Sequence, residues 1–145
     1  EVVQRFCQEG RSAARLDHEN IARVYTIGND GRFHYIAFEY IEGTTIRQRV
    51  ERNGPLTIGE AINYTLQIAD ALVHAAERGV VHRDIKGANI LTTKEGLVKL
   101  ADFGVAAKLG ELEAERSAGR EAAPVGTPYW MAPEVSGNVS GRAVE

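Results

Sequence analysis

Eight consecutive residues near the middle of the chain read His82-Arg83-Asp84-Ile85-Lys86-Gly87-Ala88-Asn89. An aspartate can orient a hydroxyl and accept its proton, a lysine can neutralise a phosphate, and an asparagine carbonyl can ligate a hard cation. Any one of these side chains alone in a loop is usually only solvated. Together, Asp84, Lys86 and Asn89 form the set that phosphoryl transfer needs, so this segment is the first candidate active site.

Two further motifs follow along the chain. Asp102-Phe103-Gly104 comes after an expected strand, where the carboxylate can hold Mg²⁺ and the glycine lets the chain turn. The second motif is Gly126-Thr127-Pro128-Tyr129-Trp130-Met131-Ala132-Pro133-Glu134. By itself it fits ordinary core packing better than function. The joint occurrence of all three motifs reverses that preference.

The first part of the chain predicts a helix and a hairpin. Val2, Phe6, Glu9, Ala13 and Leu16 have helical spacing and share one helix face, on which Glu9 is the only charged residue. Strand-like runs follow at residues 22–27 and 33–39. The cluster Gly28-Asn29-Asp30-Gly31 between them predicts the hairpin turn. A short helix is expected before Asn53-Gly54-Pro55.

The clearest helix is predicted to start after Thr57, which has Glu60 three residues later as in a capping box. Gly79 lies where a helix C-cap is expected. Apolar residues at helical spacing mark one face of this helix: Ile58, Ile62, Leu66, Ala69, Val73 and Ala76. Short strands are then expected at residues 80–81, 89–92 and 97–101, with a turn at 94–96, and residues 104–128 are expected to form a long loop.

Composition sets limits on the class of protein. The 145 residues are 43% hydrophobic and 26% charged with a net charge of −3, which is typical of a soluble globular protein and argues against a nucleic-acid partner. Cys7 is the only cysteine, so an intrachain disulfide is excluded and a reducing, cytoplasmic location is favoured. No apolar run approaches the roughly 18 residues of a membrane span, so no membrane partner is expected.

The three motifs resemble those of the eukaryotic-type Ser/Thr protein kinase family. His82-Arg83-Asp84 with Lys86 and Asn89 resembles the catalytic loop, Asp102-Phe103-Gly104 the metal-binding motif, and Ala132-Pro133-Glu134 the motif that closes the activation segment. They occur in family order. The resemblance implies an α+β, bilobal kinase-like fold truncated at both ends, with residues 1–43 as part of the small lobe and 44–145 as part of the large lobe.

The same resemblance implies roles for individual residues in the transfer chemistry. Asp84 would be the catalytic base that orients the substrate hydroxyl, and Lys86 would steady the transferring phosphoryl group. Asn89 and Asp102 would bind Mg²⁺. The partners implied are ATP and a protein substrate with Ser or Thr hydroxyls, and Lys86 together with Thr127 resembles the Ser/Thr branch rather than the tyrosine branch.

Nucleotide contacts are implied at the stretch Phe38-Glu39-Tyr40-Ile41, which resembles the gatekeeper and hinge. The backbone of Glu39 and Ile41 would contact adenine, and Leu91 would lie beneath the ring. Glu9 matches the helix-C glutamate, which would pair with a lysine on strand three.

Regulation is implied by Arg83, which resembles the arginine of kinases switched on by phosphorylation of the activation segment. Between Gly104 and Gly126 the only hydroxyl side chain is Ser117. We therefore expect Ser117 to be the regulatory site, or Glu121 to substitute in part for a phosphate. Thr127 is a further candidate regulatory residue. Residues 82–91 and 126–134 look like MAP kinase kinase kinases and their septation relatives, whereas residues 5–50 look equally like bacterial Ser/Thr kinases.

The sequence also allows other interpretations. No Gly-rich phosphate loop and no strand lysine occur in residues 1–145, so a catalytically inactive kinase-like fragment, acting as a nucleotide-binding or interaction module, is the alternative to an enzyme. A glycosidase using Asp84 and Asp102 would leave Lys86 and Asn89 without a role. A zinc site is weaker still, because the His and Cys spacings match no metal motif.

Overall fold

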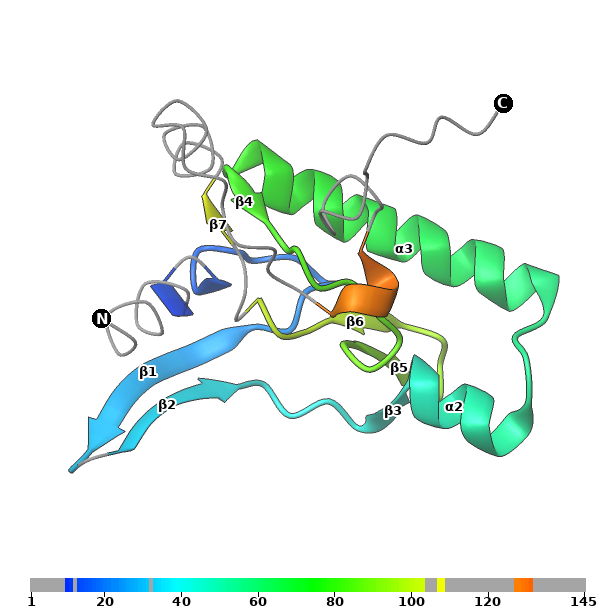
Figure 1. Ribbon diagram of the computed structural model, residues 1–145, viewed down its shortest axis with the longest axis horizontal. Coiled ribbons are helices and arrows are strands. Elements are labelled where there is room, and N and C mark those ends of the chain that lie inside the picture. Colours follow the sequence, from blue (N-terminus) through cyan, green and yellow to red (C-terminus); the bar gives the residue numbers. More distant parts are fainter. Residues whose placement is uncertain (1–9, 12, 32, 104–106, 109–126, 132–145) are drawn as a thin grey trace.

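The computed structural model describes residues 10–11, 13–31, 33–103, 107–108 and 127–131 (Figure 1). Three residues with expected roles, Glu9, Ser117 and Glu121, lie outside these ranges, as does the motif Ala132-Pro133-Glu134. The described part contains mixed small sheets and helices, consistent with the α+β class expected. Its division into lobes at residue 43 stays a prediction.

The first sheet is an antiparallel hairpin of β1 (Val24–Asp30) and β2 (Phe33–Phe38). The turn predicted at residues 28–31 begins later than expected, because the ladder continues through Gly28 and Asn29 to the pair Asp30↔Phe33 and only Gly31 of the cluster lies between the strands. Gly28 lies within β1 and does not form the turn. A Cβ atom there would lie 2.6 Å from the hydroxyl oxygen of Tyr35, its cross-strand partner, so glycine makes room for that ring.

The second sheet has the order β3-β5-β6, all antiparallel, and consists of β3 (Gly43–Thr45), β5 (Ile90–Thr93) and β6 (Val98–Leu100). The strands expected at 89–92 and 97–101 are thus confirmed to within about one residue. Between β3 and β5 the chain forms α2 (Ile46–Asn53), whose N-terminus is capped by the side chain of Thr45. The sheet joins the hinge stretch to both catalytic motifs.

The long helix is α3 (Ile58–Glu77). As predicted, Thr57 and Glu60 form a capping box: the Thr57 hydroxyl accepts from the Glu60 N–H, and the Glu60 carboxylate accepts from the Thr57 N–H at 2.8 Å. At the other end Gly79 adopts a φ of 70°, the left-handed conformation that commonly terminates helices. These local signals fix both ends of α3.

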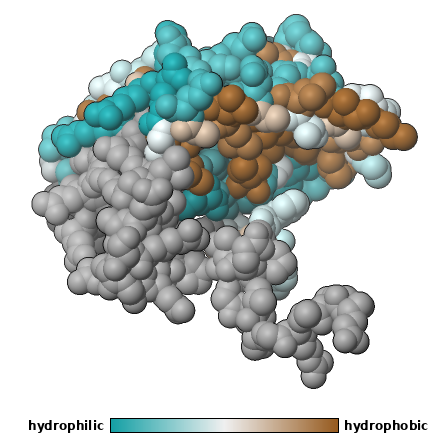
Figure 2. Space-filling view, turned by 90° about the horizontal axis from the view of Figure 1, so that it is seen from above, coloured by the Kyte–Doolittle hydropathy of each residue, from teal (hydrophilic) through white to brown (hydrophobic). Residues whose placement is uncertain are grey.

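The face of α3 that packs on the sheets is not the face whose spacing predicted the helix. Its buried residues are Tyr64, Ala71 and Ala75, with Ile68 and Leu72 packed against the same core. The predicted stripe lies outward, and Figure 2 shows apolar side chains gathered along this helix; the large exposed ones are Ile58, Ile62, Leu66 and Val73. A helix that is apolar on both sides is typical of one buried on both sides.

The core lies between α3 and the β3-β5-β6 sheet. Its centre contains Val98 and Leu100 of β6, together with Ile21, which bridges to Leu100. Asn20 is buried here, and its amide nitrogen donates to the Val98 carbonyl at 2.8 Å and to the Gln67 side chain at 2.9 Å. These bonds connect the segment before β1 to both α3 and β6.

Part of the loop expected at residues 104–128 is ordered into short elements. Ala107–Lys108 forms β7, which pairs with β4 (Val80–Val81), and Pro128–Trp130 forms the single 3₁₀ turn η1. β4 leads directly into the His82 motif. Among the described helices, none is both long and apolar enough to cross a lipid bilayer.

Candidate active site

His82 anchors the first motif to the second. Its ring is buried, its Nδ1 accepts from the Asp84 N–H at 3.2 Å, and its Nε2 therefore donates to the Ala101 carbonyl at 3.0 Å. The ring also packs against Phe103, with centroids 4.5 Å apart. Burial lowers the pKa of His82, which keeps the neutral tautomer that this bonding requires. The loop and the segment carrying Asp102 are thus fixed relative to each other.

The Asp84 carboxylate accepts four hydrogen bonds. Oδ1 receives the Thr127 hydroxyl at 2.7 Å and the Thr127 N–H at 3.0 Å. Oδ2 receives the Lys86 ammonium at 2.7 Å and the Asn89 amide at 3.0 Å. Since a carboxylate offers about four lone-pair sites, these donors saturate it. Asp84, Lys86, Asn89 and Thr127 therefore form one cluster, assembled from two distant segments.

This bonding determines the charge state of Asp84. Burial by itself raises the pKa, but the hydrogen bonds from Lys86, Thr127 and Asn89 outweigh it and lower the pKa to about 2. The side chain is only 10% exposed, so the anion is held by specific donors and hardly by water. It is ionised throughout the physiological pH range.

Asn89 connects this cluster to the position of Asp102. Its amide N–H groups donate to the Asp84 carbonyl at 2.8 Å and to the Asp84 carboxylate, so the amide oxygen is the atom available to a cation. The Ala101 N–H donates to the Asn89 carbonyl at 2.8 Å, which places Asp102 beside Asn89 at the same end of β5 and β6. An amide and a carboxylate oxygen form a donor set that suits Mg²⁺.

The residues described contain no cluster of three or more His, Cys, Asp or Glu side chains that could hold a metal by themselves. A Mg²⁺ ion at Asn89 and Asp102 would therefore take further ligands from phosphate and water, as Mg²⁺ commonly does. The same finding offers no support for the zinc alternative in this part of the chain.

Two motif residues have strained backbone. Arg83 and Asp102 have φ values of 66° and 62°, and within the described ranges they are the only residues other than glycine with positive φ. Side chains other than glycine rarely adopt this conformation, which costs of order 1–3 kcal/mol and persists where surrounding contacts enforce it. The two strained positions are the ones that flank His82 and Phe103, at the turns that aim Asp84 and Asp102.

The residues expected to contact adenine lie in the hinge and in β5, whereas the first motif, which supplies most of the transfer cluster, precedes β5 in the chain. Residues 39–42, here called the hinge segment, connect β2 to β3. Leu91 is two residues beyond Asn89 on β5, about 7 Å along the strand, and it is paired with Thr45 on one side and Lys99 on the other. Leu91 and Asn89 are thus two residues apart in sequence, next to the strands that border the hinge segment, and their contacts to a nucleotide stay a prediction.

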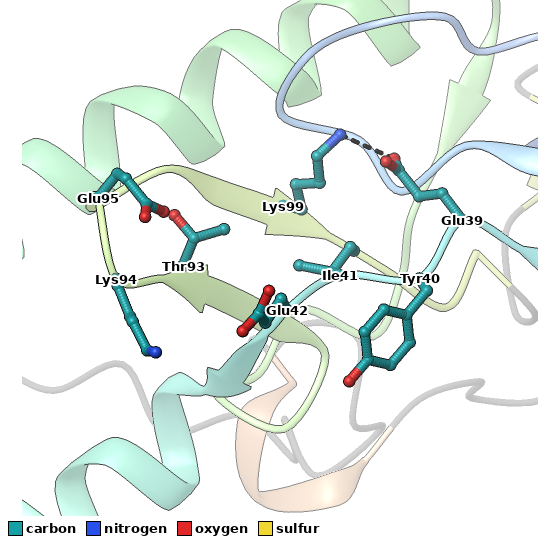
Figure 3. A pocket seen from close by; sticks show the side chains of 8 residues that line it. All are labelled: Glu39, Tyr40, Ile41, Glu42, Thr93, Lys94, Glu95 and Lys99. Carbon is teal, nitrogen blue, oxygen red and sulfur yellow. Dashed lines mark hydrogen bonds and ion pairs between the residues drawn. The ribbon is translucent and has the colours of Figure 1, made fainter.

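A pocket of about 290 Å³ lies between the hinge segment and the β5–β6 turn (Figure 3). It is not the transfer site, since neither Asp84 nor Asp102 lines it. Figure 3 shows the Lys99 ammonium and the Glu39 carboxylate pointing toward each other at one end of the pocket. The lining residues are Glu39, Tyr40, Ile41, Glu42, Thr93, Lys94, Glu95 and Lys99.

Two contacts in this region were missed by the sequence analysis. Thr127 was expected to be regulatory, yet its hydroxyl and backbone bind Asp84 directly. Lys99 belongs to none of the sequence motifs, although it forms an ion pair with the hinge residue Glu39. The only signal for Lys99 was its position in a strand that leads to Asp102.

Comparisons with known proteins agree with this geometry. The family described as "Protein kinase domain" matches residues 1–144. MAP3K epsilon protein kinase 1 of Arabidopsis thaliana is 44% identical over 137 residues, which is 93% of this chain and 10% of that protein. Serine/threonine-protein kinase PrkC of Bacillus subtilis is 44% identical over 109 residues, covering 75% of this chain and 17% of that protein.

A further relative, Cell division control protein 7 of Schizosaccharomyces pombe, is 43% identical over 120 residues, covering 83% of this chain and 11% of that protein. The mixture of eukaryotic and bacterial relatives matches the mixed resemblance seen in the motifs. The chain spans at most about a fifth of the length of these curated relatives.

Proposed function

Because this chain belongs to the protein kinase domain family, we propose that it forms the catalytic centre of a protein serine/threonine kinase. The reaction is transfer of the γ-phosphate of Mg-ATP to Ser or Thr hydroxyls of proteins. The observation that carries the proposal is the Asp84 carboxylate, held as an anion by Lys86, Asn89 and Thr127. The proteins at 44% identity that are named as kinases support it.

Asp84 acts mainly by orienting the substrate hydroxyl. With a pKa of about 2 it is a weak proton acceptor, so positioning of the nucleophile outweighs proton abstraction. All its lone-pair sites are occupied, and the incoming hydroxyl therefore has to take the place of a present donor. The Thr127 hydroxyl is the matching group, since it too is an aliphatic hydroxyl 2.7 Å from Oδ1.

Lys86 serves the phosphoryl group. An ammonium has three N–H donors, and two of those of Lys86 go to Asp84 and Thr127. The third would be available to an oxygen of the phosphoryl group, whose negative charge Lys86 would offset during transfer. Mg²⁺ bound at Asn89 and Asp102 supplies charge neutralisation for the phosphates. The hydroxyl oxygen forms a bond to the γ-phosphorus while the bond to the leaving ADP oxygen breaks, and the hydroxyl proton passes to the Asp84 carboxylate late in the transfer.

At the nucleotide end we assign the backbone of Glu39 and Ile41 to adenine, with Leu91 beneath the ring. Arg83 and Ser117 are assigned to regulation by phosphorylation, and Glu9 to pairing with a lysine on strand three of the family fold. The cellular location proposed is cytoplasmic. The alternative, an inactive kinase-like module, predicts nucleotide or protein binding without transfer.

The test is an assay of the full-length protein with Mg-ATP labelled in the γ-phosphate and a peptide library with Ser, Thr or Tyr as acceptor. We expect label on Ser and Thr peptides only, and loss of that activity in the Asp84→Asn variant. Label on Tyr peptides would reject the Ser/Thr assignment. Nucleotide binding without any transfer would favour the inactive module.

A further inference from the structure

Lys99 of β6 makes a short contact to the hinge segment. Its ammonium donates to Glu39 Oε1 at 2.7 Å, and the two side chains are only 15% and 20% exposed. By contrast, the ion pair between Arg47 and Glu51 on α2 has side chains that are 69% and 57% exposed. Exposed pairs contribute little, whereas a pair largely shielded from water is screened less.

Glu39 is held from two sides. Toward the β1–β2 hairpin its N–H donates to the Arg23 carbonyl at 2.9 Å, and its Oε1 accepts from the Arg23 N–H at 2.8 Å. Toward the second sheet the same Oε1 accepts from Lys99. Burial raises the pKa of Glu39, but the bonds from Lys99 and Arg23 outweigh it and keep the carboxylate ionised. Glu39 thus links the two sheets.

The position of Lys99 in the sheet gives this contact a functional consequence. Lys99 is the cross-strand partner of Leu91, so both side chains stand on the same face of the sheet. Leu91 is assigned to the face of adenine, and the hinge backbone is assigned to its hydrogen-bonding edge. The stem of the Lys99 side chain therefore lies next to Leu91, while its ammonium contacts the hinge residue Glu39, as Figure 3 shows.

We propose that Lys99 is a positioning residue for ATP. Through its ion pair with Glu39, Lys99 holds the hinge backbone at the distance from Leu91 that adenine binding requires. This inference rests on the proposed function. Lys99 is not a catalytic residue, because it contacts Glu39 and lies away from Asp84, Asn89 and Thr127. Its effect is on nucleotide binding: hydrogen bonds to adenine weaken when the hinge backbone shifts, while the transfer cluster keeps its own bonds.

The experiment compares Lys99→Met, which keeps the length of the stem but removes the charge, with Lys99→Arg, which keeps the charge. Lys94→Met is the matched control, since it makes the same change at an exposed position in the adjacent turn. For each full-length variant, the KM for ATP, kcat and the melting temperature are measured, and the affinity for ADP is measured without turnover.

We expect Lys99→Met to raise the KM for ATP and weaken ADP binding about three- to tenfold, with kcat within about twofold of wild type, as for loss of one partly shielded charged hydrogen bond. Lys99→Arg should restore most of the affinity, and Lys94→Met should leave it unchanged. In a double-mutant cycle, Lys99→Met should add little once Glu39→Gln is present, because both act on one contact.

The outcomes separate the two proposals. A wild-type protein that binds ADP but transfers no phosphate would reject the kinase activity, and the ADP affinities of the variants would still decide the role of Lys99. Unchanged nucleotide affinity in Lys99→Met would overturn the positioning role. So would a fall in both kcat and melting temperature with no change in the KM for ATP. A wild-type protein that binds no nucleotide would overturn both.

Discussion

Replacement of Asp84 by asparagine tests the central cluster most directly. The carboxylate accepts four hydrogen bonds, two on each oxygen. An asparagine keeps one acceptor oxygen and replaces the other by an NH₂ group. That NH₂ group must face either the Thr127 donors or the Lys86 and Asn89 donors. At least two hydrogen bonds are therefore lost, and the NH₂ group is placed against two other hydrogen-bond donors.

The pKa gives the size of the effect on stability. The pKa of Asp84 falls from an ordinary 3.8 to about 2 on folding, and each pKa unit corresponds to about 1.4 kcal/mol. The ionised form therefore stabilises the fold by up to about 2 kcal/mol at neutral pH. Because the folded pKa is the lower one, this contribution is complete above about pH 4 and is lost as the pH falls toward 2. Asparagine cannot ionise and lacks it at every pH.

The effect on turnover is larger. We expect kcat of the full-length Asp84→Asn variant to fall about 10²–10⁴-fold, the range for loss of a positioned acid–base group. ADP affinity should change little, since the hinge segment and Leu91 are unaffected. The assays are phosphate transfer at saturating Mg-ATP, ADP binding, and denaturant unfolding at pH 7. Asp30→Asn, at the exposed end of β1, is the matched control and should behave as wild type.

More than half of the wild-type kcat in Asp84→Asn would refute the assignment of Asp84. A full loss of turnover with no loss of stability at pH 7 would refute a narrower point, namely that the four donors stabilise the anion in the folded state. An equal loss of kcat in the control variant Asp30→Asn would mean that the assay reports general damage to the domain.

Three further predictions address the metal site, the helix cap and pH. Asp102→Asn should lower kcat at least as much as Asp84→Asn and raise the Mg²⁺ concentration needed for half-maximal rate; an unchanged Mg²⁺ titration would reject Asp102 as a ligand. Thr57→Ala should cost about 1 kcal/mol of unfolding free energy, and Thr57→Ser should restore it, because the cap hydroxyl accepts from the Glu60 N–H. Burial, together with Arg78 and His18, lowers the pKa of His74, whose Nε2 has no hydrogen-bond partner in the described part of the chain. Stability should therefore decline as the pH drops below about 6.5, and His74→Phe should make the melting temperature less dependent on pH in this range.

The sequence predicts elements well where the signal is local. The capping box at Thr57 and Glu60 and the glycine after α3 act within a few residues, so they specify the helix ends without reference to the rest of the chain. The strands that contain Leu91 and Lys99 were likewise placed to within about one residue. The motifs gave Asp84, Lys86 and Asn89 as one group, and the hydrogen bonds confirm that these side chains meet.

The sequence pattern does not predict which face of a helix is buried or which distant residues come into contact. α3 is apolar on two sides, and periodicity alone cannot tell which side meets the sheets; Tyr64 and Ala71 are buried while Leu66 is exposed. The hairpin turn was misplaced because glycine at position 28 signals a turn equally well whether it bends the chain or accommodates Tyr35. Contacts such as Thr127 with Asp84 join residues far apart in sequence, and no local signal reports them.

The two aspartates of the motifs lie in opposite surroundings, which supports their different roles. Asp84 is almost fully buried, and its four hydrogen bonds fill every lone-pair site. A cation there would have to displace Lys86 or Thr127, so this carboxylate is suited to orient a hydroxyl and poorly suited to bind metal. Asp102 is exposed, has a left-handed backbone conformation and follows Ala101, whose N–H donates to the Asn89 carbonyl. Because Mg²⁺ usually keeps several waters when it is bound, we propose the exposed Asp102 as its carboxylate ligand. If Asp84 bound the metal instead, its carboxylate would have to lose hydrogen bonds that it accepts in the structure. We therefore assign orientation of the hydroxyl to Asp84 and metal binding to Asp102.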